Sequence, residues 1–203
     1  MDKHCFKTDL TQDTIIDQHY QDEAIFDSHF KHKDFQHCQF EHIDFQDVSF
    51  ENSYFVNVTF IHCDLSNIKL NHTLFRHVRF ENCKLMGTDF SESIFDQVIF
   101  QECLCSFANF AFMHNKTVQF QHCCLQNASF VEVKMTKTSF DECDLRECEF
   151  LHASLSHIDL SSCQIEGIMT SSQDIAGAII AYNQAPALIH LFKSQNQGIK
   201  KLW

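Results

Sequence analysis

The sequence predicts an all-β fold in which the chain winds as a quadrilateral parallel β-helix and ends in a short α-helix. Three observations predict it: a five-residue period, one position of that period occupied mostly by Phe, and a change of pattern near residue 174. The 203 residues include 22 Phe but only 1 Trp and 3 Tyr, which points to a structural position repeated along the chain. We expect a β-helix over residues 1–173, with regular repeats from about 20 to 168, and a C-terminal cap and helical dimerisation segment over residues 174–203.

The five-residue period is defined by its central position. Between Phe30 and Ile165, the 28 residues whose numbers are divisible by five comprise 17 Phe, 7 Leu and one each of Met, Ile, Cys and Asn. Two residues before each centre lies a small or β-branched residue, such as Cys38, Val48 or Val58. This spacing fits neither an α-helix nor an isolated strand, whose periods are 3.6 and 2 residues. A corner every five residues explains it, because four sides close a coil of 20 residues with both positions facing inward. Upstream, the register continues weakly through Leu10, Ile15, Tyr20 and Ile25.

Cysteine and histidine suggest chemistry but follow the same repeat. One inward column, spaced by 20 residues, consists of Cys63, Cys83, Cys103, Cys123, Cys143 and Cys163. A metal or redox ladder is the alternative to small apolar packing residues, which we favour because Cys-x-x-Cys spacing is missing. Nine of the 14 His share one outward position, at residues 32, 37, 42, 62, 72, 77, 122, 152 and 157. Only His42 and His62 fall on adjacent coils as a possible metal pair, and we expect a solvated surface instead.

No motif indicates catalysis. The sequence contains no nucleophile elbow, Gly-rich phosphate loop or His-Glu-x-x-His segment, so we expect a binding protein with no catalytic residue, metal or cofactor. The N-terminal residues lack the apolar stretch of a signal peptide, and no apolar run is long enough to span a membrane. We therefore expect a cytoplasmic protein that does not contact a membrane.

The charge favours a protein partner over nucleic acid. A net charge of −12 at pH 7 opposes direct phosphate-backbone binding, which requires clustered Lys and Arg. An acidic surface instead suits a basic partner. The candidate acidic surface consists of two outward columns, one with Glu41, Glu81 and Asp141 and the other with Asp44, Asp64 and Asp144.

Two surface features interrupt the polar pattern. Asn115 takes a central position, so we expect either a backbone bulge or a hydrogen bond from Asn115 into the coil, with an imperfect coil favoured over a functional projection. The candidate partner-binding segment at this irregularity comprises Phe112, Met113, His114, Asn115 and Lys116. The second feature is an outward apolar column of Tyr54, Leu74 and Ile94, for which a partner contact and a tolerated exposed surface are equally good interpretations.

The C-terminal segment has a helical pattern. Asn183 is a candidate N-cap and Pro186 fits the first turn of a helix of about ten residues. The apolar stripe of this helix caps the last coil or joins two rods end to end, and we favour dimerisation. The candidate dimer residues are Ala185, Leu188, Ile189, Phe192 and Trp203.

These patterns resemble a known family. Segments such as Cys63-Asp64-Leu65-Ser66-Asn67 and Cys143-Asp144-Leu145-Arg146-Glu147 are similar to the consensus of pentapeptide-repeat proteins, which implies a right-handed pentapeptide-repeat solenoid. Gly177-Ala178-Ile179, Gln184-Ala185 and Gly198-Ile199 resemble the C-terminal segments of the quinolone-resistance (Qnr) branch.

The Qnr resemblance implies a function. Members of that branch are dimeric rods that bind the type II topoisomerases gyrase and topoisomerase IV as DNA mimics and protect them from quinolones. Phe112-Met113 resembles the start of a Qnr loop, shorter here, whereas the unbroken register from Phe45 to Phe60 leaves out the other loop. Residues 31–168 carry 19 acidic and 10 basic residues, about half the charge density of a DNA duplex. The alternative function is a scaffold module with an unrelated protein partner.

Overall fold

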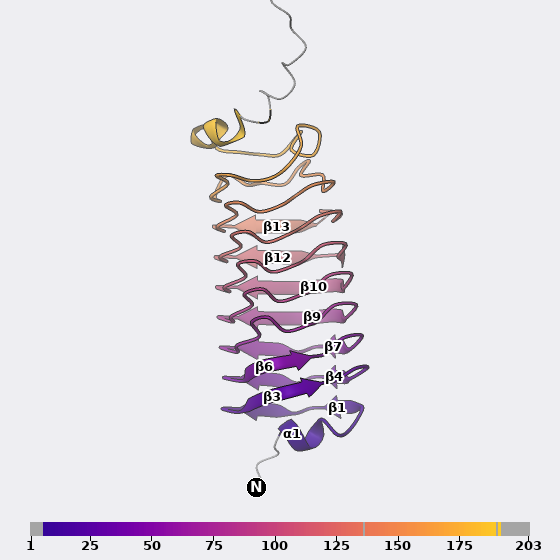
Figure 1. Cartoon of the computed structure of the whole chain (residues 1–203). Coiled ribbons are helices and arrows are strands. Elements are labelled where there is room, and N and C mark those ends of the chain that lie inside the picture. The colour runs from indigo at the N-terminus through magenta and orange to yellow at the C-terminus, as the bar shows by residue number, and fades with distance from the viewer. Residues whose placement is uncertain (1–5, 136, 190, 192–203) are drawn as a thin grey trace, which may run out of the picture.

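The computed structural model describes residues 6–135, 137–189 and 191, which form a rod of stacked coils. The chain starts at one end with the short helix α1 (Phe6–Asp9) and rises coil by coil to the 3₁₀ helix η1 (Tyr182–Leu188) at the other end (Figure 1). In this view the near strands β3 and β6 point right and the far strands β9 and β10 point left as the chain rises. The coil is therefore right-handed, and the predicted right-handed parallel β-helix is confirmed.

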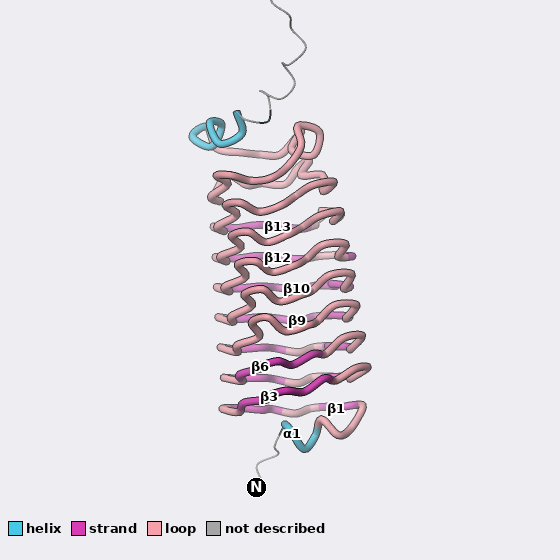
Figure 2. The backbone as a smooth tube through the Cα atoms, in the orientation of Figure 1, coloured by secondary structure: helices cyan, strands magenta, loops and turns pink. Residues whose placement is uncertain are grey.

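The walls of the rod consist of short strands separated by corners, as the tube in Figure 2 shows. The strands are β1 (Thr14–Ile16), β2 (His19–Gln21), β3 (Ala24–His29), β4 (Asp34–Gln36), β5 (Gln39–Glu41), β6 (Asp44–Ser49), β7 (Tyr54–Val56), β8 (Thr59–Ile61), β9 (Leu74–Glu81), β10 (Ile94–Gln101), β11 (His114–Asn115), β12 (Val118–Gln121) and β13 (Thr138–Asp141). The main sheet follows the order β1-β4-β7-β9-β10-β12-β13, and β3 pairs with β6 in a second sheet.

The register of these pairs confirms the 20-residue coil. Ile15 pairs with Phe35 and Phe60 pairs with Phe80, always in parallel and 20 residues apart. Single bridges carry the same offset to the pair of Asp159 and Ile179. Parallel pairing with this offset therefore runs from Thr14 to Ile179.

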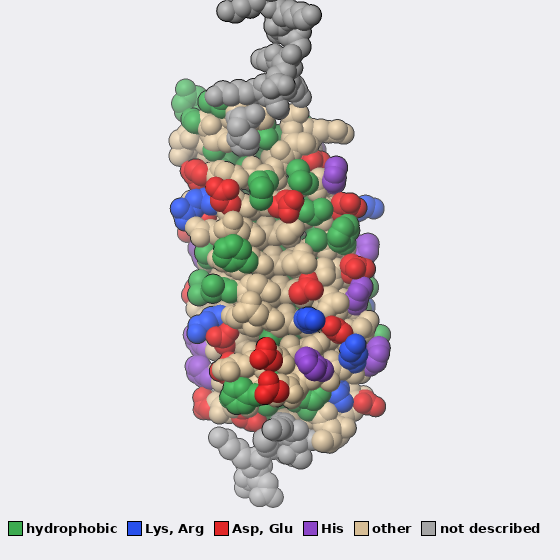
Figure 3. Space-filling model, viewed as in Figure 1, with side chains coloured by type: hydrophobic (Ala, Val, Ile, Leu, Met, Phe, Trp, Pro, Cys, Tyr) green, Lys and Arg blue, Asp and Glu red, His purple; other side chains and the backbone are tan. Residues whose placement is uncertain are grey.

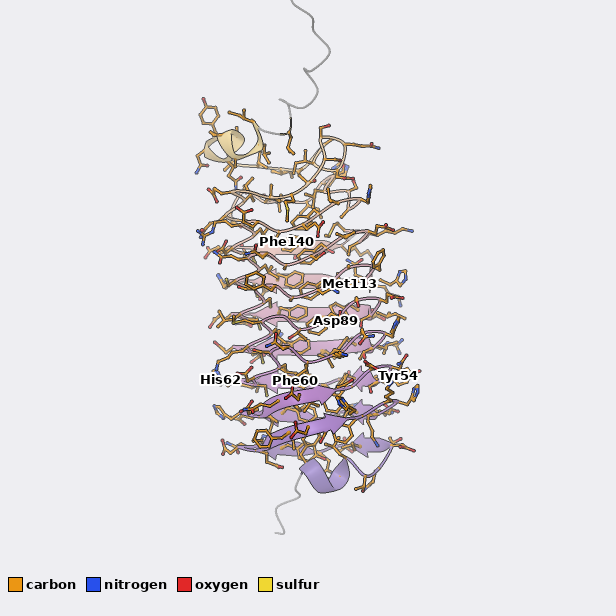
Figure 4. The ribbon with its side chains drawn as sticks, viewed as in Figure 1. Tyr54, Phe60, His62, Asp89, Met113 and Phe140 are labelled. Carbon is orange, nitrogen blue, oxygen red and sulfur yellow. The ribbon has the colours of Figure 1, made fainter. Side chains whose placement is uncertain are left out.

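Inward phenylalanine rings fill the rod. All of the predicted centres from Phe30 to Ile165 are buried except Phe30 and Asn115, which are partly buried. Rings in the same column stack almost in parallel: the centroids of Phe60 and Phe80 lie 4.9 Å apart, and those of Phe80 and Phe100 lie 4.8 Å apart. The ring spacing equals the strand spacing of about 4.8 Å, so one geometry satisfies the backbone and the core together. Figure 4 shows Phe60 and Phe140 within the rod, with Tyr54 and His62 at its edges.

The corners explain why histidine recurs at one outward position. His42, Asn57 and His62 have φ values of 52°, 54° and 53°, and nearly every residue two places after a centre shares this left-handed conformation. Asn, Asp and His adopt it more readily than most residues other than Gly. The His residues at these corners are thus favoured by backbone geometry, a reason that the sequence analysis missed.

A short C-terminal helix is present as predicted, but it begins after Ala181 instead of at Asn183, its first part is 3₁₀, and it is α-helical only from Ile189. The 3₁₀ part is η1. Gln184 fixes this start, because its Oε1 accepts a hydrogen bond from the Ala181 N–H at 2.6 Å. Pro186 lies inside η1 and has no N–H to donate to a longer α-helical ladder.

Replacing Phe80 by Ala should lower the free energy of unfolding by about 3–5 kcal/mol, because a cavity replaces a fully buried ring between two stacked neighbours. Chemical denaturation followed by far-UV circular dichroism measures the change. Tyr54→Ala is the control, since Tyr54 is half exposed and its removal should cost much less. A loss below about 1 kcal/mol for Phe80→Ala would contradict the stacked core.

Candidate functional site

The predicted irregular segment stays inside the coil. Phe95 pairs with Asn115 and Val98 pairs with Val118, so the 20-residue register passes through the segment without an inserted residue. The expected bulge is therefore wrong, and the candidate residues from Phe112 to Lys116 do not form a projecting loop. Phe112 is 46% exposed at a corner, whereas Met113 is buried.

At Met113 and Asn115 the usual order of side-chain sizes is reversed, since the narrow position normally holds the smaller side chain and the central position the larger one. Met113 occupies the narrow position and Asn115 the central one, so the flexible thioether side chain fills space beside the short amide. Asn115 Nδ2 donates a hydrogen bond to Thr138 Oγ1 in the next coil. Of the two expected outcomes, a bulge or a hydrogen bond into the coil, the structure shows the hydrogen bond. Asn115 Oδ1 is buried without a partner. This unpaired oxygen destabilises the coil locally.

The candidate acidic surface is divided and largely paired. Asp64 lies 3.3 Å from Lys84 Nζ, and Asp144 lies 2.7 Å from an Arg146 nitrogen. The hydrogen bond from Arg146 holds the pKa of Asp144 below its ordinary value. Glu81 is likewise paired with Arg79 at 2.7 Å.

The six acidic candidates do not form one continuous patch. Asp44 and Asp64 are bridged neighbours, but Lys84, Leu104 and Cys124 lie between them and Asp144 in the same column. In the other column Ile61 separates Glu41 from Glu81, and Asp141 is exposed farther along the rod. Figure 3 shows acidic, histidine and hydrophobic side chains interspersed on the face in view.

The apolar column is contiguous. Tyr54 pairs with Leu74, and Leu74 pairs with Ile94, on one outer wall of the rod. Tyr54 is 50% and Ile94 is 43% exposed. We call this side the β1 wall and define it by residues 14–16 and the corresponding residues of each later coil.

The cysteine column packs inside the rod and also donates hydrogen bonds. The thiol of Cys83 donates to the Phe60 carbonyl of the preceding coil at 3.4 Å, and Cys103 donates to the Phe80 carbonyl at 3.3 Å. Thr73 makes the same bond to the Phe50 carbonyl at 3.0 Å, which explains why Cys and Thr share the narrow position. Burial raises the pKa of the Cys148 thiol, so the reactive thiolate is disfavoured there.

Corner histidines interact between coils. The rings of His42 and His62 stack with centroids 5.2 Å apart, which confirms that they are neighbours. Asn57 connects two others, because His37 lies 3.0 Å from its Nδ2 and His77 lies 3.1 Å from its Oδ1. Among the described residues, no group of three or more His, Cys, Asp or Glu is arranged to hold a metal ion. The same part of the chain contains no helix long and apolar enough to cross a membrane.

The candidate dimer residues separate into two environments. Leu188 is buried against the last coil of its own chain, whereas Ala185 and Ile189 are exposed. Phe192 and Trp203 lie outside the described residues. Dimerisation through this segment stays a prediction.

Gln184 is an important residue that the sequence analysis did not assign to the cap. Its buried side chain donates from Nε2 to the carbonyls of Leu160 and Cys163, at 2.8 and 2.6 Å. Together with its bond to Ala181, these contacts attach η1 to the last coils. A Gln directly after a candidate N-cap was the available signal, but its partners are more than 20 residues away.

A known protein family matches most of the chain. A family described as pentapeptide repeat region matches residues 28–110, 53–128 and 113–184. No curated protein sequence matches the chain. A trypsin-treated form of QnrB1, a plasmid-mediated fluoroquinolone resistance protein, is 16% identical with a TM-score of 0.37, over 93% of this chain and 99% of that chain.

Two further solved structures show the same level of similarity. HetL, a pentapeptide repeat protein involved in heterocyst differentiation regulation in the cyanobacterium Nostoc, is 13% identical with a TM-score of 0.39, over 80% of this chain and 90% of its own. A pentapeptide repeat protein of the Arabidopsis thaliana thylakoid lumen is 22% identical with a TM-score of 0.29, over 45% of this chain and 64% of that chain.

Replacing Asn115 by Leu and Thr138 by Val together should raise the free energy of unfolding by about 1–3 kcal/mol, because the buried unpaired oxygen is removed with its neighbour's hydroxyl. Thr138→Val alone should instead destabilise the protein, since it also leaves Asn115 Nδ2 without its acceptor. Urea titration of the two variants checks the opposite signs. If both variants destabilise equally, the assignment of Asn115 to the coil interior is wrong.

Proposed function

Because the chain belongs to the pentapeptide repeat family, we propose that it is a non-enzymatic binding rod that occupies the DNA-binding surface of gyrase or topoisomerase IV in the cytoplasm and protects the enzyme from quinolones. The interior is filled by side chains, so recognition uses the outer walls. The observation that carries the proposal is an unbranched acidic rod whose register runs from Thr14 to Ile179. At about 4.8 Å per coil, this rod is about 40 Å long.

Shape supports the proposed DNA mimicry more than charge does. The net charge of −12 gives the rod the sign of DNA. However, Asp64, Glu81 and Asp144 are paired with cations on the same rod, so the acidic surface is weaker than a count of residues suggests. The choice of a topoisomerase as partner rests on the resemblance of two C-terminal segments to the Qnr branch, namely Gly177-Ala178-Ile179 and Gln184-Ala185.

A scaffold role with an unrelated protein partner is the second candidate function. The β1 wall favours it, because Tyr54, Leu74 and Ile94 present contiguous apolar surface without any resemblance to DNA. A DNA-binding saddle is basic and hydrated, whereas this column suits an apolar partner surface.

In a supercoiling assay with purified gyrase and a fluoroquinolone, the added protein should raise the drug concentration needed for half-inhibition. The rescue should weaken as salt is raised if charge contributes, because screening reduces attraction between the rod and a basic saddle. Direct binding to gyrase and topoisomerase IV is measured in parallel. If the protein neither binds these enzymes nor rescues gyrase at low salt, the topoisomerase proposal is wrong and the scaffold role is favoured.

We also propose that two rods join through their C-terminal ends. Leu188 covers its own last coil, and this leaves Ala185 and Ile189 exposed at the end of the rod. Ile189→Asp should therefore shift the mass in light scattering from twice 23.7 kDa towards 23.7 kDa. Leu104→Asp is the control, since Leu104 is comparably exposed but lies on a side wall in the middle of the rod. An unchanged dimer mass for Ile189→Asp would move the interface elsewhere, and a monomeric wild type would remove it.

A further inference from the structure

The β1 wall loses its strand ladder near the C-terminal end of the rod. Parallel pairing continues along this wall from β1 through β4, β7, β9 and β10 to β11, where it reaches Asn115. The next two coils carry Lys134 with Met135 and Ser154 with Leu155 at the same places, and these described residues belong to no strand or bridge. In Figure 2 the coils above β13 run as loops.

The core changes over the same coils. Centres of the β1 wall are Phe35, Phe55, Phe75 and Phe95, whose rings stack at 4.9 and 5.3 Å and then meet edge to face at 5.1 Å. Asn115 and then Met135 replace the ring in the following coils. Phe95 still pairs with Asn115, so the ladder ends one coil after the last ring of this wall.

A cavity lies on the wall between these two coils. It has a volume of about 550 Å³, and its polar lining comprises Lys134, Lys137, Thr138, His152, Ser154, Ser156 and His157. All of these side chains can donate hydrogen bonds, and no carboxylate lines the cavity. This composition contrasts with the acidic charge of the whole chain.

The two lysines also lack the partners that other cations have. Lys116, in the coil below, is paired with Asp96 at 3.1 Å, and Lys84 is paired with Asp64. Within the described part of the chain, Lys134, Lys137 and Lys69 are the Lys and Arg residues with described side chains for which no ion pair is formed. Two of these three therefore line one cavity.

One acidic residue beside His152, Asp174, is already engaged. Asp174 accepts hydrogen bonds from the His152 backbone N–H at 3.2 Å and from Ser171 Oγ at 2.6 Å. Asp174 therefore positions the backbone beside the cavity, and it does not line the cavity itself.

We propose that this cavity binds the phosphoryl group of a small phosphate ester. Two lysine ammonium groups match the charge of a phosphate dianion, and the serine hydroxyls and histidine rings supply further donors to its oxygens. The volume is larger than one phosphate and falls within the range of small-molecule sites, so it has room for the organic part of the ester. This site is separate from the proposed topoisomerase contact.

Isothermal titration of the full chain with inorganic phosphate and with adenosine monophosphate tests the site, in low-salt buffer without a topoisomerase. We expect saturable binding of both probes and tighter binding of the ester. Binding of inorganic phosphate alone would contradict the ester and assign the cavity to the free ion. Absence of saturable binding for either probe at millimolar concentration would overturn the proposal.

Matched lysine variants locate the binding. Lys134→Gln with Lys137→Gln should weaken binding at least about tenfold, because two charge-assisted contacts are lost. Lys69→Gln is the control, since Lys69 is also an exposed, unpaired lysine but lies on another wall. Thermal unfolding should be unchanged in both proteins because these side chains are exposed. Equal weakening by the control, or no weakening by the double variant, would show that the cavity is not the site.

Discussion

The rod depends on the match between ring stacking and strand spacing. Phe60, Phe80 and Phe100 stack at 4.8–4.9 Å, which is also the distance at which parallel strands hydrogen-bond. Each coil therefore adds ring contacts and backbone bonds in the same step. On the β1 wall the ladder reaches Asn115 and ends at Met135, one coil after the last ring.

Inward positions could be predicted from the sequence because they repeat and exclude water. The centres, the narrow positions and the 20-residue coil all follow from residue type at period five. Events that depend on distant contacts could not be predicted in the same way. Asn115 keeps its register because Thr138 in the next coil accepts its hydrogen bond, and Gln184 sets the start of η1 through Ala181 and two carbonyls of earlier coils. The acidic columns were visible in the sequence, and two of their cations, Arg79 and Arg146, lie two residues from their acids, but Lys84 becomes a neighbour of Asp64 only after the chain is coiled.

The acidic columns and the β1 wall suit two different kinds of partner. Three of the six acidic candidates are neutralised by Lys or Arg side chains from their own or an adjacent coil, so a basic partner meets a shaped rod of moderate charge. The β1 wall is different in character, with an apolar column at Tyr54 and a lysine-lined cavity farther along. A rod with unlike walls can contact a large protein on one side while another side remains available.

The contacts of Gln184 have a consequence for how the rod ends. A parallel coil leaves unpaired carbonyl groups at its last turn, and such an edge is a template on which another chain can add strands. Gln184 Nε2 covers the carbonyls of Leu160 and Cys163, and Leu188 covers apolar surface beside them. The Gln184 amide therefore occupies two carbonyls on which a further parallel strand would otherwise be built.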